Sequence, residues 1–259
     1  MFEAAEAYER DMGHWSKKLA PLFLDFVGVK VGDHVLDVGC GTGSLTFCLG
    51  QTTGAAKIVG IDPSEGFIEY ARAQNHDSRV TFDIGDARSL PYADGSFDVC
   101  VASLIMGFIP DALKAACEMR RVTRPGGLVA TCFWDTGGAM QNFEFFWNNV
   151  TALDPTAEPR HWRHLPNGTA AALSNLWCEA ALTNVATAGL PVQFEFDSFA
   201  AYWRPLSANQ GPPGAYLATL SQERREALKN KLREQLIGDG ADRALTFNGK
   251  AWAVKGMVL

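Results

Sequence analysis

The sequence has 259 residues, of which 47% are hydrophobic and 20% are charged, so a large core is possible and general disorder is excluded. The formal net charge is −6 and no basic block appears, which disfavours a nucleic-acid partner because phosphate binding requires concentrated positive charge. The longest strongly apolar stretch, 99–109, is too short to cross a bilayer, and the N-terminal residues lack a signal-peptide pattern. Six scattered cysteines without a CxxC pair predict mostly buried, reduced thiols in a cytoplasmic protein.

Residues 1–27 have the apolar spacing of an amphipathic helix, and an alternation of β-rich and helical segments begins at Val35. The β-rich runs occupy 35–39, 57–62, 79–86, 97–105 and 127–134, and the helical segments between them occupy 43–50, 64–74 and 111–121. This alternation predicts an α/β fold with a doubly wound parallel sheet, since right-handed crossovers place helices on both faces.

The pattern changes after Trp134. We expect an aromatic-rich insertion over 135–170, a helix over 170–182 and a strand over 183–196. A Gly/Pro-rich loop is expected over 203–214, followed by a charged helix over 221–236 that Ser221 caps. The alternating C-terminal segment is predicted to form a last strand that pairs with the run at 183–196. No linker is long enough to separate a second domain, so we expect one domain over 1–259.

The most informative segment is VLDVGCGTG, residues 35–43. Its glycines have the spacing GxGxG, which differs from the GxGxxG of dinucleotide-binding loops. Asp37 precedes the first glycine by two residues, and a carboxylate there repels a pyrophosphate but attracts an ammonium group. The loop therefore favours a cationic or zwitterionic nucleoside over a dinucleotide. The alternative, a tight turn without a ligand, is less favoured because three glycines in five residues are costly without a close neighbour.

Further polar residues are predicted at the carboxyl ends of the next strands, which form one edge of the sheet. Asp62 can accept hydrogen bonds from both ribose hydroxyls or cap the helix that begins at Pro63–Ser64, and these roles are compatible. Asp86 can accept an adenine amine beside Ala87 or serve as a turn residue. Ser103 can bind an amino-acid ammonium or fill a strand interior.

Together, VLDVGCGTG, GIDPSEGFIEYAR, GDARSLPYADGSFDVC and MRRVTRPGGLV resemble the class I S-adenosylmethionine-dependent methyltransferases, in particular their small-molecule branch (methyltransferase type 11), which includes the ubiquinone/menaquinone methyltransferases. The resemblance covers 30–134, with a looser similarity in YERDMGHWS. It implies a Rossmann-like, seven-stranded, mostly parallel sheet with a reversed last strand, and S-adenosylmethionine as the cofactor. The implied cofactor-binding residues are Asp37, Gly39, Cys40, Gly41, Thr42, Gly43, Asp62, Pro63, Asp86, Ala87, Ser103 and Leu104.

Within the expected single domain, the resemblance implies three parts: a helical N-terminal cap, a cofactor-binding core, and a remainder that completes the sheet and carries substrate-binding insertions. These parts occupy 1–27, 30–134 and 135–259. The segment around 8–15 or the loop at 207–214 is predicted to close over the cofactor, and for the loop an ordinary Gly/Pro connection is an equal alternative. No metal-ligand pattern appears, and we expect a monomer or homodimer without a membrane partner.

The aromatic residues of the insertions favour a small, apolar or aromatic methyl acceptor. The candidate substrate residues are Tyr8, Trp15, Trp147 and Trp162. Three histidines are candidate general bases: His14, His161 and His164. Beyond Trp134 no segment matches the quinone enzymes, and the NPPY-type tetrad of nucleic-acid methyltransferases is absent.

Two other functions compete with methyl transfer. A nicotinamide-dependent oxidoreductase is disfavoured by the glycine spacing, Asp37 and Asp86. A cofactor-binding protein with a structural or regulatory role and no turnover stays open, since it would carry the same motifs.

Overall fold

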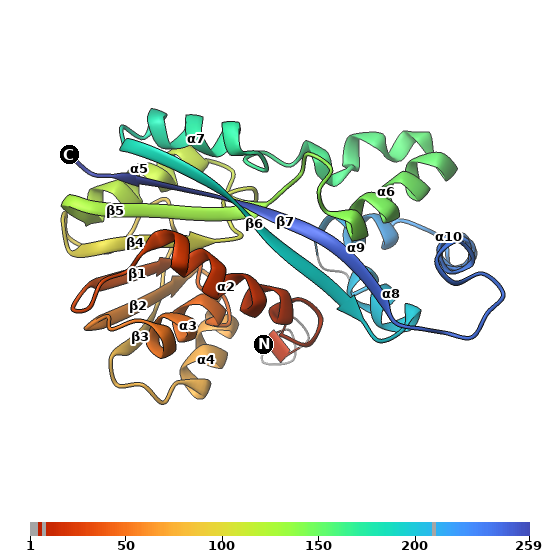
Figure 1. Ribbon diagram of the computed structural model, residues 1–259, viewed down its shortest axis with the longest axis horizontal. Coiled ribbons are helices and arrows are strands. Elements are labelled where there is room, and N and C mark those ends of the chain that lie inside the picture. The colour runs from red at the N-terminus through yellow and green to blue at the C-terminus, as the bar shows by residue number, and fades with distance from the viewer. Residues whose placement is uncertain (1–4, 7–8, 209–210) are drawn as a thin grey trace. The chain divides into compact units, whose positions relative to one another are not determined.

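The computed structural model describes residues 5–6, 9–208 and 211–259, and Tyr8 lies outside this part of the chain. Seven strands form one sheet in the order β3-β2-β1-β4-β5-β7-β6 (Figure 1). Strands β1 to β5 pair in parallel, and β7 is antiparallel to β5. The predicted fold class is therefore confirmed, including the reversed last strand and its pairing with β6. The strands are β1 (His34–Val38), β2 (Lys57–Asp62), β3 (Val80–Ile84), β4 (Phe97–Ser103), β5 (Thr123–Trp134), β6 (Thr183–Phe196) and β7 (Leu245–Met257).

The helices of the described chain are η1 (Glu9–Gly13), α2 (His14–Val27), α3 (Ser44–Thr52), α4 (Glu65–Gln74), α5 (Ala112–Val122), α6 (Gln141–Leu153), η2 (Pro155–Arg160), η3 (Trp162–His164), α7 (Ala170–Glu179), α8 (Phe199–Leu206), α9 (Gly211–Leu217) and α10 (Gln222–Ile237). The expected helices over 43–50, 64–74, 111–121, 170–182 and 221–236 are present within three residues of those bounds, whereas the helices in 135–165 and 199–217 were not expected. Ser221 caps α10, as predicted, by accepting a hydrogen bond from the backbone N–H of Arg224.

The predicted Gly/Pro-rich loop over 203–214 is wrong at both ends, because α8 extends to Leu206 and α9 begins at Gly211. In α8, the buried Phe199, Tyr202 and Leu206 follow helical spacing, and Ser198 caps the first turn. In α9 the prolines fall in the first turn, where a missing backbone donor breaks no helical hydrogen bond.

The described chain divides into two compact units, and β6 and β7 contribute residues to both. Unit 1 comprises Met1–Trp134, Pro166–Leu190 and Ala251–Leu259, and unit 2 comprises Asp135–Leu165 and Pro191–Lys250. The prediction that residues 135–259 belong to one domain with the core stays a prediction.

Unit 1 has the layered arrangement that positions the carboxyl ends of the strands. Helix α3 packs against α2 and β2, and α5 packs against β4, β5 and α7 (Figure 1). Fully buried residues from the strands and from α5 and α7 fill the core, among them Leu36, Cys100, Met119 and Trp177. The indole N–H of Trp177 donates to the Val129 carbonyl at 3.0 Å, so this buried polar atom is satisfied.

Unit 2 is built around aromatic side chains. The Tyr202 ring lies 5.2 Å from that of Phe247 and 5.4 Å from that of Phe196, measured between centroids. The Tyr202 hydroxyl donates to the backbone carbonyl of Asn142 at 3.0 Å, which connects α8 to α6. Much of the aromatic content of the C-terminal half therefore serves as core.

Candidate functional site

The glycine-rich loop directly follows the buried strand β1. Gly39, Gly41 and Gly43 have φ angles of 69°, 55° and 94°, a region that L-residues rarely adopt. A Cβ on Gly39 would lie 2.7 Å from the Ile105 side chain, whereas a Cβ on Gly41 would meet nothing within 4 Å. Gly39 is therefore required for packing. Gly41 leaves an open backbone face that a ligand can approach.

Asp37 lies near the end of β1, two residues before Gly39, and is fully buried. One carboxylate oxygen accepts the Thr46 hydroxyl at 2.6 Å, and the other has no partner among the described residues. Burial raises the pKa of Asp37 from 3.8 to about 7, although the Thr46 hydrogen bond acts in the opposite direction. A buried carboxylate with an unused oxygen is well suited to an ammonium group, because a cation would stabilise its charged form.

Asp62 connects the end of β2 to the same loop. Its Oδ2 accepts the Gly41 N–H at 3.0 Å and its Oδ1 accepts the Ser64 N–H at 2.9 Å. Burial is the main cause of its raised pKa. Ser64, rather than Asp62, caps α4, which begins after Pro63 and Ser64, so the capping role considered for Asp62 is not observed. Each oxygen of Asp62 still has a lone pair for a further donor.

Asp86 follows β3 by two residues, and its carboxylate is engaged by a neighbour. Arg88 pairs with both oxygens, with Nη2 at 2.6 Å from Oδ2, and the pKa of Asp86 is lowered to about 2. Ala87 packs against the core of unit 1. The role of Asp86 and Ala87 at an adenine stays a prediction.

At the end of β4, the Ser103 hydroxyl lies 3.4 Å from the Cys132 sulfur. The next residue, Leu104, has a φ of 63° although it is not glycine, and its N–H donates to the Cys132 carbonyl. Backbone strain of this kind is concentrated at functional sites, which gives a physical reason for Leu104, one of the implied cofactor-binding residues. No sequence pattern predicts the positive φ of Leu104.

The N-terminal segment contacts the loop through Glu9, which sequence reasoning did not identify. The Glu9 carboxylate accepts a hydrogen bond from the Thr42 hydroxyl and forms an ion pair with Lys17. Trp15 is buried in α2, and His14 beside it is exposed. The similarity in YERDMGHWS indicated the segment but could not indicate Glu9, since its contact spans 33 residues.

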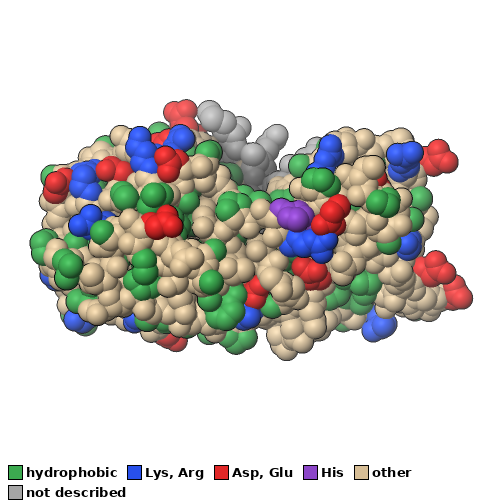
Figure 2. All heavy atoms as spheres, turned by 90° about the horizontal axis from the view of Figure 1, so that it is seen from above, with side chains coloured by type: hydrophobic (Ala, Val, Ile, Leu, Met, Phe, Trp, Pro, Cys, Tyr) green, Lys and Arg blue, Asp and Glu red, His purple; other side chains and the backbone are tan. Residues whose placement is uncertain are grey.

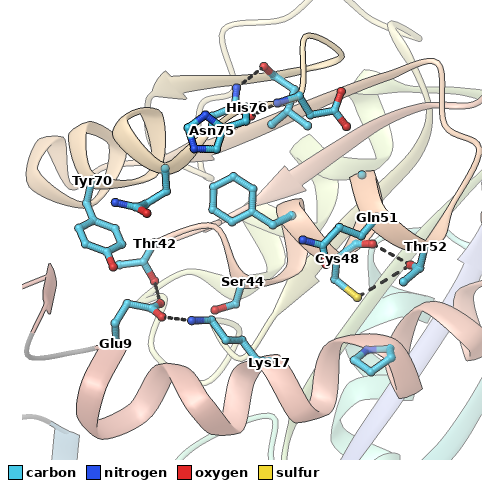
Figure 3. Close-up of a pocket in the computed structure, with 16 residues that line it drawn as sticks. Glu9, Lys17, Thr42, Ser44, Cys48, Gln51, Thr52, Tyr70, Asn75 and His76 are labelled. Carbon is cyan, nitrogen blue, oxygen red and sulfur yellow. Dashed lines mark hydrogen bonds and ion pairs between the residues drawn. The ribbon is translucent and has the colours of Figure 1, made fainter.

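A cavity of about 780 Å³ borders the loop within unit 1, between α2, α3 and α4. Figure 3 shows Glu9 and Thr42 at one end of this cavity, together with Tyr70, and Asn75 and His76 farther along. Thr42 of the loop and Ser44 at the start of α3 line the cavity, but Asp37, Asp62 and Asp86 do not. The cavity therefore lies beside the predicted nucleoside site rather than over the strand ends.

Cys40 of the loop is buried, and burial raises the pKa of its thiol, which keeps it protonated. All six cysteines are free. Three of them, Cys40, Cys100 and Cys132, are buried, whereas Cys117 and Cys178 are exposed.

The candidates in the insertion lie in unit 2. Trp147, His161 and Trp162 are buried, and the Trp147 and His161 ring centroids are 5.5 Å apart. The Trp162 indole N–H donates to Glu144 Oε1 at 3.0 Å. His164 is half exposed and lies 3.1 Å from a carboxylate oxygen of Glu158.

The described surface carries charges of both signs. On the face drawn in Figure 2, Lys and Arg side chains alternate with Asp and Glu, and no continuous basic patch is visible among the described residues. Within the described residues, no group of three or more His, Cys, Asp or Glu side chains could hold a metal ion. Likewise, no described helix is both long and apolar enough to cross a membrane.

Comparisons with known proteins match the segment that contains the glycine loop and the strands around it. Residues 36–131 match the family model described as "Methyltransferase domain". The ubiquinone/menaquinone biosynthesis C-methyltransferase UbiE of Bdellovibrio bacteriovorus is 39% identical over 122 residues, which cover 44% of this chain and 48% of that protein. The chain thus spans about half of the length of this curated relative.

Solved structures share the fold over a longer stretch. The YcgJ protein of Bacillus subtilis aligns with a TM-score of 0.60 at 19% identity, covering 95% of this chain and 98% of that chain. Phosphoethanolamine N-methyltransferase 2 of Haemonchus contortus, solved with phosphomonomethylethanolamine and S-adenosylhomocysteine, aligns with a TM-score of 0.61 at 17% identity, covering 100% of this chain and 57% of that chain. At these identities the likeness concerns the fold. The glycine loop, Asp37 and Asp62 all lie in residues 36–131, the part of this chain that matches the methyltransferase domain model.

Proposed function

We propose that this chain is an S-adenosylmethionine-dependent methyltransferase that acts on a small, apolar or aromatic molecule. The observation that carries the proposal is the buried Asp37 with an unused oxygen, set at the start of a glycine loop whose Gly41 leaves an open backbone face. The methyltransferase domain and the C-methyltransferase relative support it.

Each part of the cofactor has a residue of suitable chemistry at the carboxyl edge of the sheet. Asp37 binds the ammonium group of the methionine part, and the open face of Gly41 admits the cofactor close to the backbone. Asp62 accepts the ribose hydroxyls with the lone pairs that Gly41 and Ser64 leave unused. Asp86 and Ala87 lie at the adenine.

The bound cofactor supplies an already activated methyl group, so the protein contributes chiefly alignment and exclusion of water. Glu9 holds the N-terminal segment against the glycine loop through Thr42. This contact keeps water from the loop and orders the segment that we propose as a lid.

The identity of the methyl acceptor does not follow from the similarity to the ubiquinone/menaquinone biosynthesis C-methyltransferase. The family model ends at residue 131, before the first residue of unit 2. Because the strand ends supply the cofactor site, we infer that the side chains that select the acceptor come from outside the matched region. A small apolar or aromatic acceptor is consistent with the aromatic character of unit 2.

The experiment that tests this function follows transfer of the methyl group directly. The protein is incubated with a small-molecule extract and S-adenosylmethionine whose methyl group carries three deuterium atoms, and products are analysed by mass spectrometry. A labelled product that depends on the protein is expected. The Gly41→Asn variant, which fills the open face, should give none. Tight cofactor binding without any labelled product would instead support the non-catalytic role.

A further inference from the structure

Two adjacent rings of unit 2 carry buried N–H groups with no acceptor among the described residues. Trp147 lies in α6, and His161 lies between η2 and η3. Their ring centroids are 5.5 Å apart and their planes differ by 33°. Trp147 is fully buried and His161 is 1% exposed. Neither Trp147 Nε1 nor His161 Nε2 has a hydrogen-bond partner in the described part of the chain.

The hydrogen bonding of His161 determines which of its nitrogens carries the proton. Nδ1 accepts the backbone N–H of Arg163 at 3.1 Å, so Nδ1 has no proton. Burial is the main cause of a lowered pKa for His161, assisted by Arg163 and His164 and opposed by Glu144 and Glu158. The ring is therefore neutral at neutral pH with its proton on Nε2, and that nitrogen acts as a donor rather than as a general base.

Other buried tryptophans show that such a donor is normally satisfied in this protein. Trp162 Nε1 donates to Glu144 and Trp177 Nε1 donates to Val129, both at 3.0 Å. A buried donor without an acceptor costs about 1–3 kcal/mol. Tyr216 also packs on Trp147, at 5.7 Å between centroids, but its hydroxyl donates to Asp154 Oδ2. Two unsatisfied donors on neighbouring rings therefore indicate a position for an oxygen atom from outside the protein.

We propose that the Nε2–H of His161 and the Nε1–H of Trp147 together bind a carbonyl or hydroxyl oxygen of an otherwise apolar methyl acceptor. The proposal rests on the proposed function and specifies the chemistry of its substrate. An uncharged oxygen fits better than an anion, because both donors are neutral and buried. The same two donors could hold a buried water molecule, and the experiment separates these two sources of the oxygen.

Two substitutions at His161 separate the roles of its nitrogens. His161→Asn keeps an acceptor near the position of Nδ1 for the Arg163 N–H but removes the Nε2 donor, whereas His161→Gln keeps a donor near Nε2. Trp147→Phe removes the second donor and retains an aromatic ring. Tyr216→Phe is the matched control, because it removes a hydroxyl on a ring that packs on Trp147 but is already paired with Asp154.

The probes are 2-naphthol and 2-methylnaphthalene, which have similar shapes and differ in the oxygen. Their dissociation constants are measured by calorimetry in the presence of S-adenosylhomocysteine. The wild type and the Tyr216→Phe and His161→Gln variants should prefer 2-naphthol by at least about tenfold. His161→Asn and Trp147→Phe should lose most of this preference. In NMR spectra of the wild type, the indole N–H resonance of Trp147 should shift with 2-naphthol only.

The result that overturns the proposal is a preference for 2-naphthol that persists in His161→Asn, or a Trp147 N–H resonance that does not respond to 2-naphthol. A cross-peak from water to both N–H groups that survives 2-naphthol binding would assign the oxygen to a buried water molecule. Binding of neither probe at millimolar concentration also overturns it. Failure of methyl transfer with an intact oxygen preference would contradict the proposed function and leave this binding site standing.

Discussion

Substitution of Asp37 by Asn tests the charge on which the cofactor site depends. Because the pKa of Asp37 rises from 3.8 to about 7 on burial, about nine tenths of the group is protonated at pH 6 and about one tenth at pH 8. If the ammonium group binds the ionised form, the affinity for S-adenosylhomocysteine should rise about tenfold between these pH values. Asn cannot ionise, so this contribution should vanish in Asp37→Asn, and the affinity at pH 8 should fall by at least about tenfold.

The same substitution should stabilise the protein without ligand. The folded protein binds the Asp37 proton more tightly than the unfolded chain, so the free energy of unfolding falls as the pH rises from 3.8 to about 7. By pH 8 the ionisation of the buried Asp37 has lowered the free energy of unfolding by on the order of 4 kcal/mol. The Asn amide can still accept the Thr46 hydroxyl, but its buried NH₂ group lacks an acceptor, which costs about 1–3 kcal/mol. A net gain on the order of 1–3 kcal/mol is therefore expected.

The assay pairs calorimetric titration with S-adenosylhomocysteine at pH 6, 7 and 8 with urea unfolding at the same pH values. The ligand's own amine titrates as well, so the difference between wild type and Asp37→Asn is the quantity of interest. The reasoning is refuted if both proteins show the same pH dependence of binding, or if Asp37→Asn is less stable than wild type at pH 8.

Three further substitutions test other parts of the site. Gly41→Asn fills the open face in a backbone conformation that Asn tolerates, so it should abolish S-adenosylhomocysteine binding in calorimetry. Gly28→Asn is the control, because Gly28 has a φ of 77° and nothing within 4 Å, and this variant should bind normally. Equal loss of binding in both variants would show that the backbone, not the open face, is responsible. Asp62→Ala removes the acceptor for the Gly41 N–H as well as a ribose partner, so the affinity should drop at least about tenfold, and unchanged affinity in a folded variant removes Asp62 from the site. Glu9→Ala should change the free energy of unfolding by less than about 1 kcal/mol. It should accelerate amide hydrogen exchange in η1 and reduce the protection of η1 that S-adenosylhomocysteine gives, and unchanged exchange would contradict the lid assignment.

The parts of the fold that the sequence predicted correctly are those encoded locally. The apolar run ending at Asp37 and the three closely spaced glycines specify a strand followed by a tight turn, and the structure has both. The cap at Ser221 needs only its own residue and the next turn of helix. Parallel pairing of β1 to β5 follows from right-handed crossovers between short segments.

What the sequence could not predict depends on contacts between distant residues. The Glu9–Thr42 contact and the pairing of Trp162 with Glu144 are visible only in three dimensions. The positive φ of Leu104 has no compositional pattern. The end of α8 and the start of α9 read as a loop in the sequence, because glycine and proline in the first or last turn of a helix have the same composition as a turn.

The measurement that tests the central claim most directly is calorimetric titration of the wild-type protein with S-adenosylhomocysteine and, separately, with NAD. The glycine spacing, the unused oxygen of the buried Asp37 and the open face of Gly41 predict micromolar binding of S-adenosylhomocysteine and no comparable binding of NAD. Tighter binding of NAD than of S-adenosylhomocysteine would contradict the assignment of this site to a methyl-donor cofactor.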